Sequence, residues 1–307
     1  MDQPIRVTQL SDTHFLEAGA EPEGMGAYDT SVAFDRVFAD IVSGDQPTDY
    51  VVVTGDVADH GRAEQYEVAA EALGRFDVDV RVCPGNHDFD MPFHDGFSQG
   101  NIEVPRVVEM GSWAFLFADS SSGMMVPGDD GRLIDPPGET RLHSNGSFST
   151  AETAWLRDAC SATDAEHVFV WLHHPPGVTN HFQSDPDFTD LWRELLGDLP
   201  TIRGLGAGHL HMPLQWDLVD RPVFLAPSLK NNFSLADDTW LPPGYRTYEF
   251  GADGSVSSQA HFVDDEELWP RRPLGRALRS LFAGELSFEE LAEIIARRQI
   301  TAATQST

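Results

Sequence analysis

Strand-like runs and helical apolar spacing alternate through the first third of the chain. Residues 4–11 (Pro-Ile-Arg-Val-Thr-Gln-Leu-Ser) alternate between apolar and polar side chains, which predicts a strand. The valine-rich run 49–54 and the segment 78–83 predict two more strands, the first of them buried. The intervening segments 31–43 and 62–75 have the apolar spacing of helices. Strand, helix, strand, helix, strand is the order of a layered α/β fold.

The middle of the chain is less regular but continues this pattern. Further strands are predicted at residues 113–118, 167–172, 201–207, 222–225 and 245–250. The segment 120–147 is rich in Gly, Pro, Ser and Asp, which predicts a long loop. After it, Ser149 and Glu152 have the spacing of a capping box, which predicts the start of a helix. A Gly-Ala-Asp-Gly turn follows residue 250.

The C-terminal segment differs in character from the rest of the chain. Helical spacing of apolar residues follows Pro270, and Ser287 with Glu290 has the spacing of a second capping box. We therefore divide the chain into a main domain, residues 1–264, and a C-terminal helical extension, residues 265–307. The extension could pack on its own chain, form a lid or mediate a homodimer.

Composition and charge narrow the classes of partner. The chain has 307 residues, of which 41% are hydrophobic, and this suits a globular domain with a sizeable core. Its formal net charge is −30, and Lys230 is its only lysine. This charge disfavours binding to long nucleic acids, whose phosphates need basic surface. It is typical of a well-solvated or salt-adapted surface, and an anionic substrate would need a local positive centre.

Cysteine usage and the lengths of apolar runs bear on the cellular compartment. Cys83 and Cys160 lie far apart in the sequence, which predicts buried reduced thiols rather than a disulfide framework. No apolar run is long enough to cross a bilayer. The first residues lack the basic and apolar regions of a secretion signal. We therefore expect a cytoplasmic protein without a membrane span.

Side chains with metal-binding chemistry follow the predicted strands at the points where they end. In chain order these are Asp12 and His14, Asp56, Asn86 and His87, His173, and His209 and His211. Because the carboxyl ends of strands share one rim in layered α/β proteins, residues far apart in sequence can converge there. Imidazoles, carboxylates and an amide oxygen suit Mn²⁺, Fe²⁺/Fe³⁺ or Zn²⁺ better than Cu⁺. Two such ions about 3.5–4 Å apart can clamp a phosphoryl group and generate hydroxide near neutral pH.

The order of the motifs carries more weight than any one of them. Asp-x-His and Gly-Asp occur by chance, whereas Gly-Asn-His-Asp and Gly-His-Leu-His are more specific. Together, from residue 5 to about 263, they resemble the calcineurin-like metallophosphoesterase superfamily. The segments 55–59, 172–176, 226–228 and 242–246 resemble its class III cyclic-nucleotide phosphodiesterase and glycerophosphodiesterase branch. Its Ser/Thr protein phosphatases carry Arg where this chain has His60, which counts against a protein substrate.

This resemblance implies a fold as well as a chemistry. The expected architecture is a four-layer α/β/β/α metallophosphoesterase sandwich with a C-terminal helical appendage. Residues 1–264 would then form the catalytic domain. No motif position is occupied by a residue that could not do the corresponding chemistry.

The resemblance also assigns roles to individual residues. One ion would be held by Asp12, His14 and His211 and the second by Asn86, His173 and His209, with Asp56 bridging them. His87 would be the histidine that stabilises phosphoryl charge and protonates the leaving alkoxide, with Asp59 or Asp88 to orient it. The choice of His173 over His174 also comes from the resemblance. Strand alternation would send the two rings to opposite faces, which favours a structural or supporting role for His174.

Other histidines and aromatic residues belong to no motif. We expect His60, His94, His143, His167, His181 and His261 to be structural. Of these, His60 and His181 flank site loops and remain open as substrate contacts, as does His174. Four aromatic residues could stack on a base or fill a local core, and these are Phe89, Phe93, Phe97 and Phe182.

These observations lead to one functional hypothesis and several alternatives. The hypothesis is a metal-dependent phosphodiesterase that hydrolyses 3′,5′-cyclic nucleotides, glycerophosphodiesters or both by in-line attack of a metal-bridging hydroxide. A phosphomonoesterase or a nucleotide pyrophosphatase would use the same dimetal site. A non-catalytic scaffold with this fold would be expected to have lost ligands, and here the set is complete.

Overall fold

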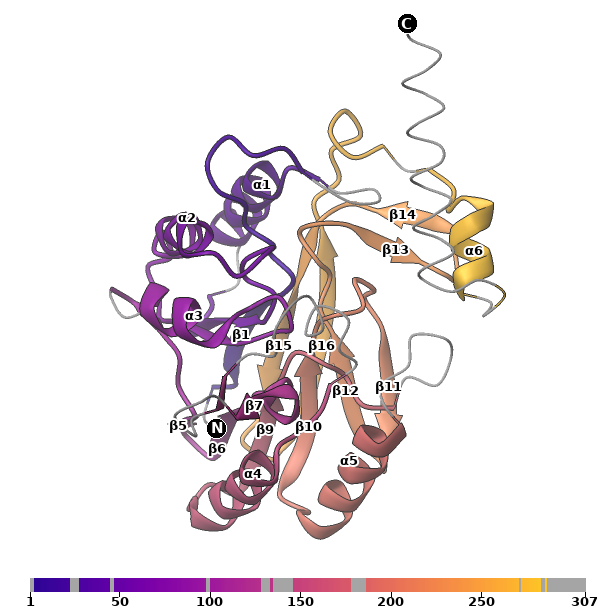
Figure 1. Ribbon diagram of the computed structural model, residues 1–307. Coiled ribbons are helices and arrows are strands. Elements are labelled where there is room, and N and C mark those ends of the chain that lie inside the picture. Colours follow the sequence, from indigo (N-terminus) through magenta and orange to yellow (C-terminus); the bar gives the residue numbers. More distant parts are fainter. Residues whose placement is uncertain are drawn as a thin grey trace, which may run out of the picture.

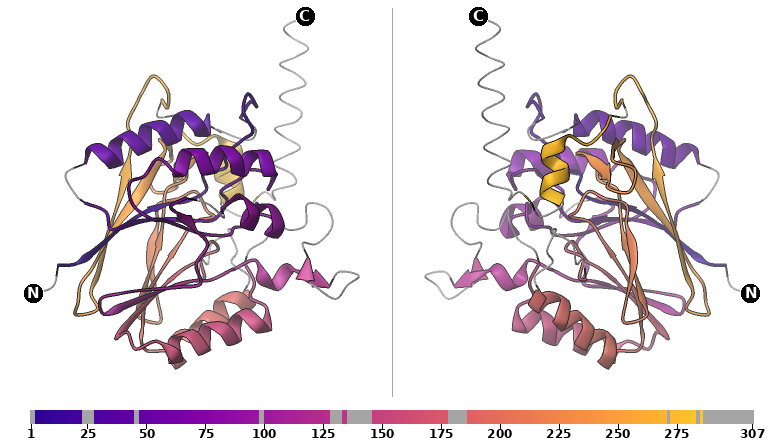
Figure 2. Two further views of the ribbon diagram at one scale, coloured as in Figure 1. Left: turned by 90° about the vertical axis from the view of Figure 1, so that its left-hand side faces the viewer. Right: turned by 90° about the vertical axis from the view of Figure 1, so that its right-hand side faces the viewer.

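Two six-stranded sheets pack face to face, with helices on both outer sides (Figure 1). The computed structural model describes residues 3–22, 28–44, 47–97, 100–127, 133–134, 146–177, 186–270, 272–282 and 285. Figure 2 shows the helices of the N-terminal part on one side of the paired sheets and two later helices on the opposite side. The predicted α/β/β/α sandwich is therefore confirmed.

The first sheet collects the strands predicted in the first third of the chain. In spatial order its strands are β16 (Val256–Phe262), β15 (Gly244–Phe250), β1 (Ile5–Leu10), β2 (Tyr50–Thr54), β3 (Val80–Cys83) and β4 (Ile102–Glu103). β1 to β4 are parallel, whereas β15 runs antiparallel to β1 and β16 to β15. Both faces of the sheet are covered at β2, which is buried along its whole length, as expected for a run of valines.

Helices cover the outer face of this sheet. They are α1 (Thr30–Ser43), α2 (Ala63–Leu73) and the short α3 (Asp90–Gly96). Asp29 begins α1 by accepting hydrogen bonds at 3.1 Å from two backbone N–H groups of its first turn. Phe34 and Val37 of α1 and Tyr66 of α2 are buried against the strands. Burial of each such side chain contributes about 1.5–3 kcal/mol.

The second sheet is built from the later strands. In spatial order they are β11 (Gln215–Leu218), β12 (Arg221–Leu225), β10 (Ile202–Ala207), β9 (His167–Trp171), β6 (Trp113–Phe117) and β5 (Val107–Met110). The four central strands are parallel and the two edge strands are antiparallel to them. Its outer face is covered by α4 (Thr150–Ala162) and α5 (Pro186–Asp198), through buried side chains such as Leu156 and Trp192.

Aromatic side chains fill the space between the two sheets. Phe169 of β9 meets Phe250 of β15 edge-on, with ring centroids 5.0 Å apart. The indole N–H of Trp171 donates to the Tyr50 hydroxyl at 3.2 Å, which joins the sheets through a buried hydrogen bond. Such aromatic pairs contribute about 0.5–1.5 kcal/mol beyond the area that they bury. This layer fixes how the strand ends of one sheet lie against those of the other.

The segment predicted as a long loop contains short elements. Within 120–147 the described residues form the 3₁₀ turn η1 (Ser122–Met124) and the antiparallel pair β7 (Val126–Pro127) and β8 (Leu133–Ile134). A second small pair, β13 (Asn232–Ser234) and β14 (Thr239–Leu241), follows the second sheet. Strands of two or three residues are too short to show an apolar period, which explains why neither pair was predicted.

At the start of α4, one of the two hydrogen bonds expected of a capping box is present. The Ser149 hydroxyl accepts from the Glu152 N–H at 3.0 Å, as predicted. The Glu152 carboxylate, however, accepts from the Asp119 N–H and from Arg106, both at 2.8 Å. Glu152 therefore ties α4 to the end of β6 rather than closing the box on Ser149.

The described part of the C-terminal segment packs on the main domain. Trp269 is buried beside the first sheet's core, and Leu274 and Leu278 are buried in the second sheet's core. Leu278 belongs to α6 (Arg276–Phe282). The capping box at Ser287 and Glu290 lies outside the described residues, and the division at residue 264 stays a prediction. Among the described helices, none has both the length and the apolar character of a membrane span.

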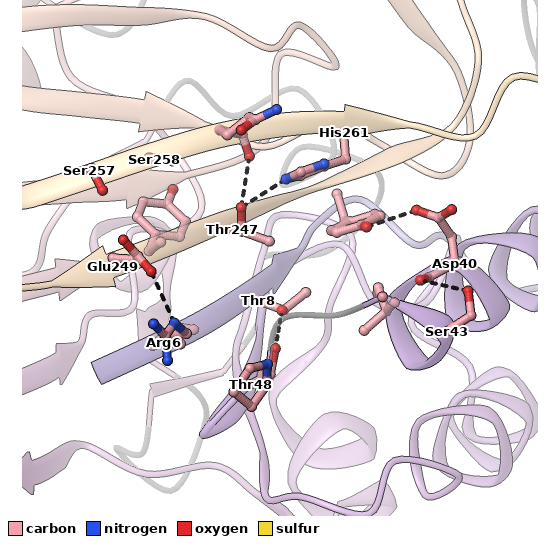
Figure 3. Close-up of a pocket in the computed structure, with 17 residues that line it drawn as sticks. Arg6, Thr8, Asp40, Ser43, Thr48, Thr247, Glu249, Ser257, Ser258 and His261 are labelled. Atoms are coloured by element: carbon pink, nitrogen blue, oxygen red, sulfur yellow. Dashed lines mark hydrogen bonds and ion pairs between the residues drawn. The ribbon is translucent and has the colours of Figure 1, made fainter. Parts of the chain in front are cut away.

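A polar hollow of about 740 Å³ lies on the outer face of the first sheet (Figure 3). Residues of β1, β15 and β16 line it together with the end of α1, and Arg6, Asp40, Glu249 and His261 are among them. Within its lining, the Arg6 guanidinium of β1 and the Glu249 carboxylate of the neighbouring strand β15 form an ion pair at 3.0 Å. None of the described residues that line it is a candidate metal ligand. The candidate chemistry therefore lies elsewhere.

Candidate metal centre

Candidate ligands from five strand ends gather at one edge of the paired sheets. Asp12 and His14 follow β1, Asp56 follows β2, Asn86 follows β3, His173 follows β9, and His209 and His211 follow β10. Both carboxylate oxygens of Asp12 lie 3.0–3.1 Å from the backbone N–H of His209, a residue 197 positions away. The two sheets therefore meet through these loops, and the structure brings the seven predicted side chains together.

The backbone is strained where these ligands sit. Eight described residues other than glycine have positive φ, and five of them are Asp12, His14, Asp56, His209 and His211, with φ between 43° and 72°. Each such residue costs of the order of 1 kcal/mol or more, and persists only where the surroundings enforce it. Strain concentrated on five candidate ligands indicates that the fold positions these side chains for a purpose other than stability.

Glycines allow the loops to approach this closely. A Cβ on Gly85 would lie 2.2 Å from a carboxylate oxygen of Asp56. A Cβ on Gly208 would lie 1.8 Å from the Ser11 hydroxyl and 2.5 Å from a carboxylate oxygen of Asp12. Both positions therefore need a residue without a side chain, which explains the glycines of the Gly-Asn-His-Asp and Gly-His-Leu-His motifs.

One group of donors consists of Asp12, His14 and His211, which each offer an atom within 4.8 Å of the others. Asp12 Oδ1 lies 3.2 Å from His211 Nε2. The other ring nitrogen of each histidine is held by an oxygen. His211 Nδ1 lies 2.5 Å from Asn231 Oδ1, and His14 Nδ1 lies 2.8 Å from Asp59 Oδ1. Contacts of this kind fix the orientation of metal-binding imidazoles.

The second group surrounds Asn86. Its side-chain oxygen lies 3.1 Å from both His173 Nε2 and His209 Nδ1. Asp56 lies between the two groups, with Oδ2 3.2 Å from His173 Nε2 and 3.6 Å from His14 Nε2. The backbone N–H of His87 donates to the other oxygen of Asp56 at 2.9 Å. Asp56 thus has the position that a bridging carboxylate would need.

The polarity around His173 tests whether these atoms suit a metal ion. His173 Nδ1 lies 2.8 Å from the Thr54 carbonyl, which can only accept, so Nδ1 carries a hydrogen. In the neutral ring, Nε2 is then an acceptor that faces the oxygens of Asp56 and Asn86. Three acceptors pointing at one another are unfavourable unless a cation lies among them. The donor set therefore fits a divalent ion, and its mixture of nitrogen and oxygen fits Mn²⁺, iron or Zn²⁺.

In the metal-free protein, the buried carboxylates of the centre favour protonation of neighbouring histidines. Burial lowers the pKa of His173, but attraction to the Asp56 carboxylate outweighs it and raises that pKa to about 9. Burial likewise opposes protonation of His211, yet the nearby Asp12 carboxylate raises its pKa. Burial raises the pKa of Asp12, but His211 lowers it to about 2. The pKa of His209 is lowered to about 3 by burial and by His173.

His87 lies beside this centre with one ring nitrogen held. Its Nδ1 is 2.6 Å from the backbone carbonyl of Asp59, and its Nε2 is 4.0 Å from Asp56 Oδ2. The Asp59 carboxylate contacts His14 instead. The sequence left two candidates to orient His87, and the structure places the backbone of Asp59 against it.

Asp88 has a different set of contacts. Its carboxylate accepts hydrogen bonds of 2.9–3.2 Å from the N–H groups of Gly85, Val57 and Ala58 and from the Tyr66 hydroxyl. Burial and the neighbouring Asp56 carboxylate raise the pKa of Asp88, while these donors oppose the rise. Asp88 thus ties the loops after β2 and β3 together, and none of its described contacts is to the His87 ring.

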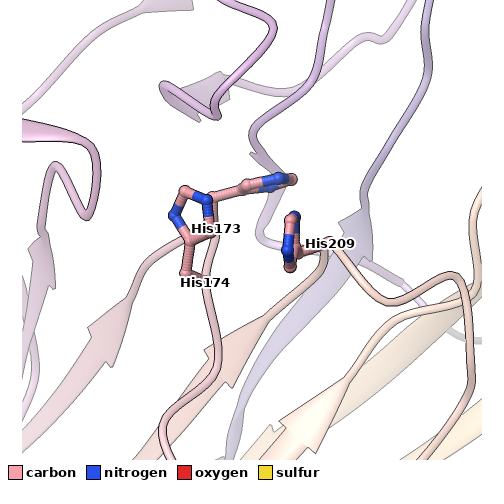
Figure 4. Close-up of side chains that lie close together, drawn as sticks. All are labelled: His173, His174 and His209. Atoms are coloured by element: carbon pink, nitrogen blue, oxygen red, sulfur yellow. The ribbon is translucent and has the colours of Figure 1, made fainter. Parts of the chain in front are cut away.

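His174 lies closer to the centre than strand alternation predicts. His173, His174 and His209 each offer a ring nitrogen within 4.8 Å of the others (Figure 4). Alternation fails here because β9 ends at Trp171, so the pleat no longer directs these side chains. His174 Nδ1 and its backbone N–H both contact the Ser120 hydroxyl, at 2.8 and 3.0 Å. The ring is thereby fixed in the wall of the site.

In the loop that follows β12, sequence reasoning named the segment 226–228 but missed Lys230 and Asn231 and the contacts that the loop makes with the centre. Ser228 and Leu229 both donate to the Asp12 carbonyl, at 3.1 and 3.2 Å. Lys230 forms an ion pair with the Asp59 carboxylate, and Asn231 contacts His211. No motif marks Lys230 or Asn231. The one available signal was that the chain's only lysine follows the family-like Ala-Pro-Ser segment.

The remaining predicted residues divide between core, rim and undescribed segments. Phe93 and Phe97 are buried in the core beside α2, so they fill the interior and do not face a substrate. His60 lies at the rim, with Nδ1 3.3 Å from Asp59 Oδ2. His143, His181 and Phe182 lie outside the described residues. Both cysteines are buried and free, as predicted.

Comparison with known sequences decides the family. The profile described as calcineurin-like phosphoesterase matches residues 5–213. The chain belongs to this family. Members of the family use a site with two metal ions and are phosphoester hydrolases, which agrees with the clustered histidines and aspartates. The resemblance inferred from the motifs is therefore confirmed.

Individual relatives indicate the branch of the family. The 3′,5′-cyclic adenosine monophosphate phosphodiesterase CpdA of Escherichia coli (strain K12) is 26% identical over 277 residues, which cover 87% of this chain and 92% of the relative. The probable glycerophosphodiester phosphodiesterase GpdQ of Arcobacter nitrofigilis is 28% identical over 211 residues, covering 67% and 71%. A dimetal phosphatase structure from Danio rerio has a TM-score of 0.54 at 15% identity, covering 86% and 100%. That last likeness shows the fold alone.

Proposed function

We propose that this protein is a binuclear metal-dependent phosphodiesterase acting on small phosphodiesters, namely 3′,5′-cyclic nucleotides, glycerophosphodiesters or both. The observation that carries the proposal is the convergence of seven side chains with nitrogen or oxygen donors, Asp56 among them, at one edge of the paired sheets. Relatives named as a cyclic AMP phosphodiesterase and a glycerophosphodiesterase support the diester class. The net charge of −30 disfavours long polyanions and so supports a small substrate.

The proposed ligand sets follow the two groups of donors. Asp12, His14 and His211 would hold one ion and Asn86, His173 and His209 the other, with Asp56 between them. When bound, two such ions neutralise phosphoryl charge and lower the pKa of water, so that it can attack phosphorus in line. The chain's own contribution is orientation. The His87 N–H fixes one oxygen of Asp56, which leaves the other facing both groups.

His87 is the proposed proton donor to the leaving alkoxide. The Asp59 carbonyl accepts from Nδ1, so Nε2 is the atom that points toward the centre and would transfer the proton. The side chain is 22% exposed, so a substrate can reach it. In its charged form the ring would also stabilise the phosphoryl oxygens. A cytoplasmic location and a homodimer stay predictions.

The test is a panel of substrates with each metal supplied separately. The metal-stripped protein would be reloaded with Mn²⁺, Fe²⁺ or Zn²⁺ and assayed on 3′,5′-cyclic AMP, a glycerophosphodiester and a phosphomonoester. We expect no turnover without metal and faster turnover of at least one diester than of the monoester. Faster turnover of the monoester would instead assign a phosphomonoesterase to the same centre. Full activity of the metal-free protein would reject the proposal.

A further inference from the structure

Lys230, the only lysine of the chain, lies within the candidate centre. Its ammonium group forms an ion pair with the Asp59 carboxylate, and the two side chains are 17% and 4% exposed. A pair this buried has lost much of its hydration. Removal of one partner therefore leaves an uncompensated charge, which is strongly unfavourable. Lys230 is thus placed to hold Asp59 in a single orientation.

Asp59 in turn contacts two functional candidates at once. Its Oδ1 lies 2.8 Å from His14 Nδ1, and its backbone carbonyl lies 2.6 Å from His87 Nδ1. The first contact leaves His14 Nε2 facing the donors, 3.6 Å from Asp56 Oδ2. The second turns His87 Nε2 toward the same centre. A shift of Asp59 would therefore move a proposed metal ligand and the proposed proton donor together.

The backbone of Lys230 is anchored on both sides. Its N–H donates to the Ser228 hydroxyl at 2.9 Å, and its carbonyl accepts from the Tyr28 N–H at 2.7 Å. The next residue, Asn231, contacts His211. The lysine side chain therefore extends from a fixed loop, and its ammonium group has a defined place against Asp59.

We propose that Lys230 is a positioning residue for the metal centre, which acts through Asp59 on His14 and His87. Outer partners of this kind typically change metal affinity by about 10–100-fold. The predicted effect on turnover rests on the proposed function, whereas the predicted effect on metal binding does not.

The first test compares metal binding by Lys230→Met and Lys230→Arg proteins. Mn²⁺ titration followed by electron paramagnetic resonance measures the two binding steps, and a His211→Ala protein identifies the step that belongs to Asp12, His14 and His211. We expect Lys230→Met to weaken that step by about tenfold or more and Lys230→Arg to retain most of the affinity. Arg279→Met, which breaks an exposed ion pair with Asp238, is the matched control and should change neither step. Wild-type binding by Lys230→Met would overturn the inference.

Chemical acetylation tests the same idea without a change of sequence. Because Lys230 is the only lysine, an amine-selective acetylating reagent neutralises this side chain and the terminal amine of the folded wild-type protein. The Lys230→Arg protein treated in the same way reacts only at the terminal amine. We expect the acetylated wild type to lose affinity at the same step and the treated Lys230→Arg protein to be unchanged. Mass spectrometry verifies that Lys230 is acetylated, and equal metal affinity of the two treated proteins would then contradict the proposal.

A double-mutant cycle separates action through Asp59 from a direct effect. If Lys230 acts through Asp59, then Lys230→Met and Asp59→Asn together should lose no more metal affinity than the worse single change. Additive losses would mean that the two residues act separately. Failure of every phosphodiester assay alongside the expected metal data would reject the proposed function and leave this inference standing. Unchanged metal affinity would reject the inference whatever the activity.

Discussion

The Asp56 carboxylate contacts a histidine of each donor group and the backbone of His87. One oxygen faces His14 and His173, and the other accepts from the His87 N–H. We therefore expect Asp56→Ala to lose both ions and to lower turnover by about 10³-fold or more, the scale of removing a preorganised charge-stabilising group. Metal content by elemental analysis and kcat on a diester check this. The matched control is Asp217→Ala, at an exposed position of β11, which should retain ions and activity.

The role assigned to His87 makes a different prediction. Because His87 is a proton donor rather than a ligand in the proposed mechanism, His87→Ala should keep both ions. It should slow diesters with poor leaving groups by about 10²–10⁴-fold and activated diesters much less. A series of aryl and alkyl diesters, read together with metal content, checks this. An equal loss across the series would remove His87 from the acid role.

At the scale of the elements, the loop after β10 shows how a close backbone approach positions the ligands of the candidate metal centre. Gly208→Ala would place a Cβ 1.8 Å from the Ser11 hydroxyl and 2.5 Å from Asp12. Relief of that overlap must displace the strand ends, so we expect a loss of about 1–3 kcal/mol in the free energy of unfolding and weaker metal binding. Urea unfolding and metal titration measure the two effects.

The matched control for that change is a glycine in a helix that covers the same sheet. Gly197 lies in α5, and a Cβ added there would meet nothing within 4 Å, so Gly197→Ala should keep the metal centre. It should also raise stability by up to about 1 kcal/mol, because alanine favours a helix. Equal loss of metal in both variants would show that the centre does not depend on the close approach at Gly208.

The strands also show which parts of the fold could be predicted from the sequence. The valine run of β2 and the buried strand β9 were predictable because both faces are covered and each run ends at a motif. The strands β11 and β16 were missed because they are half-exposed and carry few apolar residues. The motif residues could be placed at strand ends, but the contacts of Lys230 and His174 depend on loop geometry that no period encodes.

Over the whole molecule, a strongly acidic chain concentrates buried carboxylates at one edge of its sheets. The net charge of −30 is spread over the surface, where water screens it. Asp12, Asp56 and Asp59 are instead buried and depend on nearby positive charge. Lys230 supplies it for Asp59, and protonated His173 and His211 supply it for the other two when no metal is bound. Stability of the whole fold is therefore linked to pH and to metal.

The sign of this linkage follows from His173. Burial disfavours its charged form, but the Asp56 carboxylate raises its pKa from 6.5 to about 9 in the metal-free folded protein. Between these values the folded state keeps a proton that the unfolded state releases. The stabilisation is therefore complete below about pH 6.5 and is lost as pH rises through about 9. A shift of this size corresponds to at most about 3 kcal/mol, and His211 acts in the same direction.

We therefore expect the free energy of unfolding of the metal-free protein to fall between pH 6.5 and 9. Saturation with Mn²⁺ should flatten this dependence, because the ions then supply the positive charge that the protons supplied. Urea unfolding at a series of pH values, with and without the metal, measures both curves. Asp56→Asn is the control, since it removes the carboxylate that raises the pKa of His173 and should flatten the metal-free curve. A metal-free wild-type protein whose stability is constant or rises over this range would show that His173 does not carry the charge that balances Asp56.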